Sequence, residues 1–168
     1  MIAACALLTL VTAERLAELV IARRNTQRLR ALGAQEFAPA HYPLIVALHA
    51  LWLLGLWIFG YDHPIQLAWL AVFIILQGLR AWVLISIGRR WTTRVMVLPG
   101  ETLVARGPYR FVKHPNYIVV IGEIAVLPLC LGMPLYALLF SILNAAVLSI
   151  RIRAENNALA KVRKPALV

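Results

Sequence analysis

The sequence has few cysteines, few acidic residues and no repeated segment. Two of its 168 residues are cysteines, Cys5 and Cys130, and both lie in apolar segments, where we expect packing rather than a disulfide or a metal site. Seven acidic residues stand against seventeen basic ones. The basic residues are scattered at the ends of apolar segments, which argues against nucleic-acid binding. The lack of an internal repeat argues against transporters built from repeated halves.

Apolar side chains are abundant and make up 62% of the chain. Soluble domains contain about 45 to 50%, so the composition predicts an integral membrane protein. The length fits a single domain over 1–168. The first apolar segment lacks the basic start of a cleavable signal peptide, and we therefore expect it to remain in the mature protein.

The predicted fold class is an all-α integral membrane protein with about five transmembrane segments, because a span needs about 20 mainly apolar residues. Three spans are expected over 1–22, 42–59 and 65–88, and a helical hairpin over 118–150. The first arm of the hairpin, 118–131, is short for a full span unless Asn116 and Tyr117 extend it. Polar segments fill 89–117 and 151–168.

The first connection, 23–40, is expected to be an interfacial helix and loop that follows a break at Arg23-Arg24-Asn25 and stops near Gly33. In the second span, His49 is expected to pack or to anchor the interface rather than to bind a ligand.

The distribution of basic residues predicts the orientation of the chain. Apart from Arg15 and Arg80 inside spans, all fifteen others follow the first span, the third span or the hairpin. With five segments these three places lie on one side, which the positive-inside rule makes cytoplasmic. We therefore expect a multi-pass protein of the inner (plasma) membrane with its amino terminus outside.

Two groups of charges fall inside apolar segments. Glu14 and Glu18 are four residues apart and share a helix face. Either the helix end frays at the headgroups with Arg15 extended towards water, or Glu18 orients a basic residue of a site. Arg80 either reaches the headgroups or faces that site.

Glu123 lies in the first arm of the hairpin and needs a partner there. Arg110 or Lys113 is the expected partner, in a simple ion pair or in a catalytic one.

The most polar stretch of the chain is 106–117, which reads Arg-Gly-Pro-Tyr-Arg-Phe-Val-Lys-His-Pro-Asn-Tyr. Two prolines and a glycine predict a turn-rich loop instead of a long helix. Its charged and hydrogen-bonding side chains suit an anionic or zwitterionic small molecule. Just before it, 95–97 and 102–105 are expected to form a short hairpin around Leu98-Pro99-Gly100.

The stretch 107–117, followed by Arg151-Ile152-Arg153-Ala154-Glu155-Asn156, resembles the paired signature of the isoprenylcysteine carboxyl methyltransferase family. These are membrane-embedded enzymes that use S-adenosyl-L-methionine. A bacterial branch of this family methylates alkylpyrones and alkylresorcinols, which are products of type III polyketide synthases. The chain resembles that branch further upstream, at 15–19, 23–25, 41–43 and 90–94.

The resemblance implies a cofactor site on the cytoplasmic loop, with no metal and with S-adenosyl-L-homocysteine as product. The residues that it assigns to the cofactor are Tyr109, Arg110, His114, Pro115, Asn116, Tyr117, Glu155 and Asn156. Those that would hold the acceptor hydroxyl or take its proton are Arg153, Lys113, Glu155 and Glu123. Arg151 and Arg153 are two residues apart on a helix and are expected to point in different directions.

The sequence departs from the family pattern at three places. Many members have Glu-Glu where this chain has Glu155-Asn156, and many continue with an acidic, tyrosine-containing segment in place of 160–168. Arginine is usual where this chain has Lys113, and an ammonium group cannot bind a carboxylate in a fork. This favours a hydroxyl over a carboxylate as methyl acceptor.

The leading hypothesis is therefore a membrane O-methyltransferase that acts on a lipidic hydroxyl, such as an alkylpyrone or alkylresorcinol, within a type III polyketide synthase pathway. The lipid bilayer and this lipidic acceptor are its expected partners. An isoprenylcysteine carboxyl or phospholipid methyltransferase is the alternative enzyme. A small transporter or a scaffold that binds anionic lipid is the alternative without catalysis.

Overall fold

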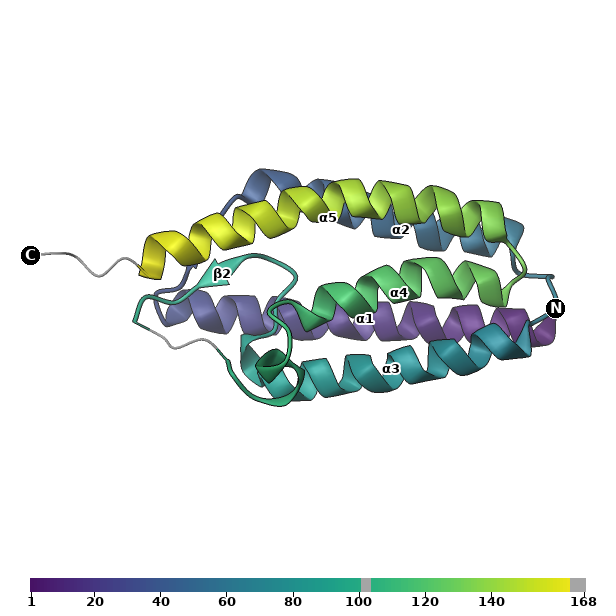
Figure 1. Ribbon diagram of the computed structural model, residues 1–168, viewed down its shortest axis with the longest axis horizontal. Helices are drawn as coiled ribbons and strands as arrows, with labels where there is room; N and C mark the ends of the chain where they lie inside the picture. Colours follow the sequence, from purple (N-terminus) through teal and green to yellow (C-terminus); the bar gives the residue numbers. More distant parts are fainter. Residues whose placement is uncertain (101–103, 164–168) are drawn as a thin grey trace, which may run out of the picture.

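The computed structural model describes residues 1–100 and 104–163, with the side chains of His41 and 158–163 left out of the description. Five helices run along the length of the molecule, each in the opposite direction to the one before it (Figure 1). They are α1 (Ile2–Ala31), α2 (Tyr42–Phe59), α3 (Leu67–Ile87), α4 (Pro115–Cys130) and α5 (Pro134–Arg163). Short 3-10 helices η1 (Pro39–His41), η2 (Gly88–Arg90) and η3 (Gly107–Arg110) occupy the connections.

Three of the helices are long and apolar enough to cross a membrane: α2, α3 with its η2 extension, and α5 over Pro134–Asn157. The bounds of α2 match the predicted span, and α3 lies within 65–88. The α4 helix has 16 residues and α1 carries several charges, so the count of five spans stays a prediction.

The α1 helix is longer than expected. It continues through Arg23-Arg24-Asn25, so the predicted break there is wrong. Arginine is a good helix former, and a polar sequence need not end a helix when it leaves the apolar layer. The helix stops at Leu32 and Gly33, whose φ of 89° is left-handed, and this confirms the predicted stop at Gly33.

The first arm of the predicted hairpin begins earlier than expected, and the second arm ends later. Asn116 and Tyr117 belong to the first turn of α4, with Pro115 at its start. The α5 helix runs on past 150, and the segment that carries Glu155 is therefore its helical continuation.

A two-stranded sheet joins two of the connections. The strand β2 (Met96–Val97) pairs antiparallel with β1 (Gln35–Glu36). The predicted hairpin partner of this strand, 102–105, falls partly on 101–103, which lie outside the described part, and the partner among the described residues is β1. Arg94 and Arg30 both donate to the Glu36 carboxylate at 2.5 Å, which favours the long-range pairing.

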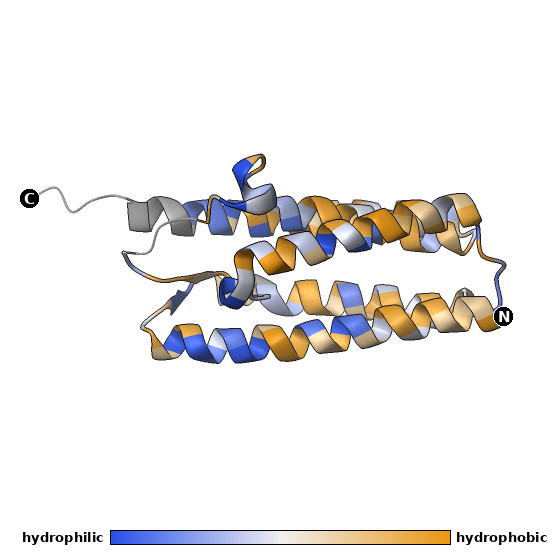
Figure 2. Cartoon of the chain, turned by 90° about the horizontal axis from the view of Figure 1, so that it is seen from below, coloured by the Kyte–Doolittle hydropathy of each residue, from blue (hydrophilic) through white to orange (hydrophobic). Residues whose placement is uncertain are grey.

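The best-packed part of the interior lies at the end opposite these connections. It includes Leu8, Leu56, Ile124 and Leu127 from three helices, α1, α2 and α4, each at most 1% exposed. Cys130 is fully buried in the same cluster, as predicted. Polar residues gather towards the other end of the molecule, where the sheet and η3 lie (Figure 2).

Candidate active site

The position of the 106–117 loop depends on its glycine. Gly107 has a φ of 57°, and a Cβ there would lie 2.0 Å from Ser86 Oγ on α3. Arg106 Nε donates to the Ser86 carbonyl at 2.8 Å. Only glycine permits this backbone and this close approach. These contacts fix the loop to the end of α3. The 3-10 helix η3 and the first turn of α4 come next along the chain.

Tyr117 and Arg151 form the buried centre of the site. The Tyr117 hydroxyl donates to the Glu155 carboxylate and accepts a hydrogen bond from Arg151 Nε at 2.9 Å. Arg151 Nη1 donates to the Thr93 carbonyl at 2.8 Å. These contacts join α4, α5 and the segment after η2, which are far apart in the sequence.

The motif loop also meets α5 one turn further out. Lys113 Nζ donates to Asn156 Oδ1 at 2.6 Å, and His114 Nε2 lies 3.4 Å from the same oxygen. His114 Nδ1 is 3.7 Å from Glu155 Oε1, and its ring stacks on Tyr117 with centroids 5.2 Å apart. The two halves of the paired signature, 107–117 and 151–156, therefore come together.

Two further groups of the site have distinctive environments. Burial, with a smaller contribution from the Glu155 carboxylate, raises the pKa of Tyr109 to about 12. Its hydroxyl therefore keeps its proton at physiological pH and can donate. Asn116 Oδ1 is buried without a hydrogen-bond partner among the described residues. Such an atom is costly to bury and indicates a missing donor.

A polar cavity of about 140 Å³ lies between the motif loop, the 87–97 segment and α5. Six predicted residues line it: Tyr109, Lys113, His114, Asn116, Tyr117 and Glu155. Three arginines, Arg90, Arg94 and Arg151, also line it. The cavity thus combines cations, a carboxylate and neutral hydrogen-bonding groups.

A larger cavity of about 310 Å³ continues from it between α1, α2, α4 and α5, with Arg80 of α3 also on its wall. Most of its walls are apolar, with Leu16 and Leu19 from α1 and Ile45 and Val46 from α2. Leu16, Leu19 and Val46 are also exposed on the outer surface of the helices. The cavity therefore borders the face of the bundle that apolar side chains cover.

Five residues line both cavities, namely Trp91, Thr92, Asn116, Tyr117 and Arg151. The polar and apolar cavities consequently adjoin at Tyr117 and Arg151. A polar molecule on one side and an apolar molecule on the other would meet there.

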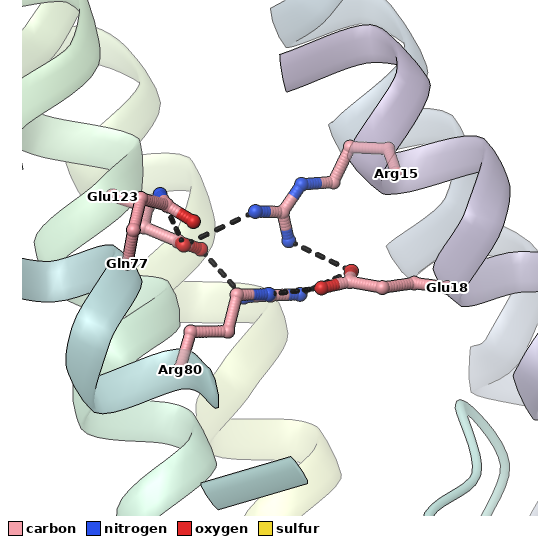
Figure 3. A network of polar contacts seen from close by, with 5 residues as sticks. All are labelled: Arg15, Glu18, Gln77, Arg80 and Glu123. Carbon is pink, nitrogen blue, oxygen red and sulfur yellow. Dashed lines mark hydrogen bonds and ion pairs between the residues drawn. The ribbon is translucent and has the colours of Figure 1, made fainter. Parts of the chain in front are cut away.

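A network of buried charges forms another part of the apolar cavity's wall (Figure 3). Arg80 bonds to Glu18 through Nε and Nη2, the latter at 2.5 Å, and to Glu123 through Nη1 at 2.6 Å. Arg15 bonds to the same two carboxylates at 3.0 and 3.1 Å. Gln77 Nε2 completes the coordination of Glu123 at 3.0 Å.

This network corrects the expected partner of Glu123. Its carboxylate binds Arg80 and Arg15, not Arg110 or Lys113. Glu123 lies six residues beyond Tyr117, about 9 Å along the helix, which takes it away from the loop. Arg80 and Glu18 face the interior and each other, so neither extends to the headgroups.

The other predicted site residues lie at the rim of the site or outside it. Arg153 is exposed, while Arg151 is buried, so the two arginines do point in different directions as expected. Arg110 is exposed, with its guanidinium 5.3 Å from the Phe111 ring centroid. Pro115 is buried at the start of α4 and sets its direction.

The sequence analysis expected one of Arg151 and Arg153 to face the acceptor and assigned that role to Arg153, although a signal for Arg151 was present. Arg151 and Glu155 are four residues apart on one helix, a spacing that puts their side chains on one face. Arg153 cannot share that face with Glu155. The same reasoning also missed Thr93, which contributes a backbone carbonyl that no side-chain pattern reveals.

Comparison with known proteins gives a family match and two relatives. The sequence model of the isoprenylcysteine carboxyl methyltransferase family matches residues 69–161, more than half of the chain. "Uncharacterized protein YpbQ" of Bacillus subtilis is 42% identical over 158 residues, which cover 91% of this chain and 94% of that protein. An "Uncharacterized protein" of Haemophilus influenzae is 24% identical, covering 89% and 90%. No solved structure matches.

Proposed function

Because the chain belongs to the isoprenylcysteine carboxyl methyltransferase family, and is thus a membrane methyltransferase, we propose that it transfers a methyl group from S-adenosyl-L-methionine to a hydroxyl of a lipidic acceptor. The observation that carries this proposal is the meeting of a polar and an apolar cavity at Tyr117 and Arg151. Methyl transfer from a sulfonium requires the two reactants in line and shielded from water. Two adjoining cavities of opposite polarity are suited to that task.

The residues of the polar cavity fit the cofactor. Glu155 suits its ammonium group or ribose hydroxyls, and Lys113 and Arg94 suit its carboxylate. The unpartnered Asn116 Oδ1 suits one of its amino groups. When bound, the cofactor supplies an electrophilic methyl group. His114 and Tyr117 would border it, while Pro115 orients the turn that carries them.

Arg151 is the cation best placed to hold the acceptor oxygen. Its Nε and Nη1 already donate to Tyr117 and Thr93, which leaves Nη2 without a protein partner among the described residues. A single free nitrogen suits one oxygen of a hydroxyl better than the paired oxygens of a carboxylate. This supports a phenol or enol acceptor, such as an alkylresorcinol or alkylpyrone from a type III polyketide synthase, over a prenylcysteine.

The apolar cavity would hold the acceptor's tail. Each methylene that leaves water contributes about 0.8 kcal/mol, so longer tails should bind better. The residues predicted to act on the acceptor differ in where they lie relative to the two cavities. Glu155 and the more exposed Lys113 line the polar cavity, whereas Arg153 and Glu123 line neither cavity.

The first test is binding and transfer with purified protein. S-Adenosyl-L-homocysteine should bind in a calorimetric titration, and labelled methyl groups should move to an alkylpyrone or alkylresorcinol, faster with long tails than with short ones. Transfer to a prenylcysteine alone would overturn the hydroxyl assignment. If the protein neither binds the nucleoside nor transfers methyl groups, the proposal that it is an enzyme is wrong, and a scaffold or transporter is favoured.

We also propose that the site faces the cytoplasm of an inner-membrane protein whose amino terminus lies outside. Hydrophilic residues gather at the end that holds the site (Figure 2), and the basic residues outside the apolar segments follow the first span, the third span and the hairpin, which supports this orientation. Single cysteines introduced into a Cys5→Ser, Cys130→Ser background would be labelled from outside intact cells. A cysteine in place of Asp62 should react, and one in place of Arg28 or Arg106 should not; the reverse pattern would invert the topology.

A further inference from the structure

His49 is a histidine of α2 whose hydrogen bonding fixes its tautomer. Its Nδ1 lies 2.9 Å from the carbonyl oxygen of Ile45, one turn earlier on the same helix. A carbonyl oxygen has no proton to give, so Nδ1 must donate. In the neutral ring the lone pair is then on Nε2.

His49 lines the apolar cavity together with Tyr117 and Arg151. Among the residues that the structure describes, no side chain or backbone group hydrogen-bonds to Nε2. Other titratable or charged groups on the walls of this cavity come from every surrounding helix: Arg15, Glu18, Tyr42, Arg80, Tyr117 and Arg151.

None of these other groups is placed to take a proton from a molecule in the cavity. The Glu18 carboxylate is bound by Arg80 and Arg15, and the arginines are already protonated. Tyr117 donates its own proton to Glu155, and Tyr42 shares a hydrogen bond of 3.1 Å with Thr93 Oγ1. Glu155 lines the polar cavity and not the apolar one.

A neutral imidazole with a free Nε2 is a hydrogen-bond acceptor that can become a base. This is a different role from the packing role that its position in an apolar span predicts.

We propose that His49 is the general base of the reaction and that its Nε2 receives the proton of the acceptor hydroxyl. The inference rests on the proposed function and adds the group that activates the acceptor. The oxygen–hydrogen bond breaks and the proton moves to Nε2, while an oxygen electron pair forms the new bond to the methyl carbon. The carbon–sulfur electron pair stays on sulfur, so the positive charge of the sulfonium is replaced by that of the imidazolium. Nδ1 continues to donate to the Ile45 carbonyl, which stabilises that cation.

Two substitutions distinguish a role of His49 as the general base from a role in packing alone. His49→Gln places an amide near the position of Nε2, which can accept a hydrogen bond but cannot hold the proton. His49→Asn keeps a donor near the position of Nδ1 and removes the distal group. Both are smaller changes than alanine, and thermal unfolding of each variant in detergent would show that it is folded.

The readout need not depend on turnover. A nitrophenol with a long alkyl tail absorbs differently as phenol and as phenolate, so its absorbance reports the transfer of its proton in the absence of any cofactor. Bound to the unaltered protein, it should ionise at a pH about one unit lower than when bound to His49→Gln. With the cofactor present, kcat for a weakly acidic lipid phenol should fall about 100-fold or more in His49→Gln, while KM changes little.

The outcomes distinguish this inference from the function on which it rests. Equal ionisation of the probe in the unaltered protein and in both variants overturns the role of His49 and leaves the methyltransferase intact. Loss of probe binding in His49→Gln, with unchanged binding of S-adenosyl-L-homocysteine, makes His49 a packing residue and also overturns it. If the unaltered protein binds neither molecule, the proposed function itself is wrong.

Discussion

Two groups of polar side chains interrupt the apolar interior, and they differ in how fully their hydrogen bonds are used. In the network of Figure 3, every carboxylate oxygen of Glu18 and Glu123 accepts at least one hydrogen bond, and all three nitrogens of Arg80 donate. In the group around Tyr117, the Asn116 Oδ1 has no partner among the described residues, and Arg151 has a nitrogen to spare.

This difference separates a structural group from a binding one. Buried charges are tolerated when they are paired and hydrogen-bonded. Both arginines and both glutamates of the network are ion-paired, although Arg15 Nε is buried without a hydrogen-bond partner among the described residues, so the four charges can remain in an apolar layer without a ligand. They tie α1 to α3 and α4. The Tyr117 group is incomplete by itself, and a molecule with donors and acceptors would complete it.

The largest effect should follow from breaking the closed network. Arg80→Met would leave the Glu18 and Glu123 carboxylates with fewer cationic partners in a buried position, and breaking a buried pair costs about 3 to 5 kcal/mol. The free energy of unfolding in detergent should fall by that amount. Binding of S-adenosyl-L-homocysteine by the folded fraction should change little, because Arg80 does not line the polar cavity.

Arg153→Met is the matched control, since it makes the same chemical change at an exposed arginine. Its unfolding free energy should stay within about 0.5 kcal/mol of the unaltered protein. Equal stability of the two variants would mean that the network does not hold the helices together.

A second, smaller effect should come from the open group. Glu155→Gln removes the charge that accepts the Tyr117 hydrogen bond and that we assign to the cofactor. A hydrogen bond to a charged group contributes about 1.5 to 3 kcal/mol, so affinity for S-adenosyl-L-homocysteine should fall about 10- to 100-fold. Tyr117→Phe should weaken it in the same direction.

Tyr136→Phe provides the control for the tyrosine, because its hydroxyl donates to the Trp52 carbonyl at 2.8 Å in the other half of the molecule. Calorimetric titration should give an unaltered affinity for this variant. If Tyr117→Phe and Tyr136→Phe bind equally well, the polar cavity is not the nucleoside site.

Local sequence patterns predicted the helices well but not the contacts between them. The bounds of α2 and the stop of α1 at Gly33 follow from apolar length and from glycine geometry. The pairing of β1 with β2 joins residues 60 to 62 positions apart, and that of Glu123 with Arg80 joins residues 43 positions apart. Which of several arginines reaches a given carboxylate depends on helix rotation and packing, and a single sequence does not contain that information.

The same limit applies to the site. The motif at 107–117 identified five of the residues that line the polar cavity, because the chemistry is concentrated in one stretch. The choice between Arg151 and Arg153 depended on which face of α5 turns inward.

A third prediction tests that choice directly. Arg151→Lys keeps a positive charge, but a single ammonium cannot reproduce donation to both Tyr117 and Thr93. We expect turnover to fall about tenfold or more, equivalent to about 1.4 kcal/mol, with a smaller change in cofactor affinity. Arg153→Lys should leave turnover unchanged. If Arg153→Lys is the damaging substitution, the catalytic role returns to Arg153.

The smallest effect concerns Glu36, an ion-paired carboxylate outside the helical bundle. Burial opposes its ionisation, but hydrogen bonds from Arg94 and Arg30 outweigh burial and lower the pKa of Glu36 below its ordinary value of 4.5. A lowered pKa in the folded state means that the stabilisation is fully present above the ordinary pKa and is lost as the pH falls through the lowered one. Arg30 is more than half exposed, so solvent screening limits the contribution to about 1 kcal/mol or less. Glu36→Gln should therefore unfold at a slightly lower temperature than the unaltered protein at pH 7, and the difference should shrink in acid; a difference that grows in acid would contradict the pairing of Glu36 with these arginines.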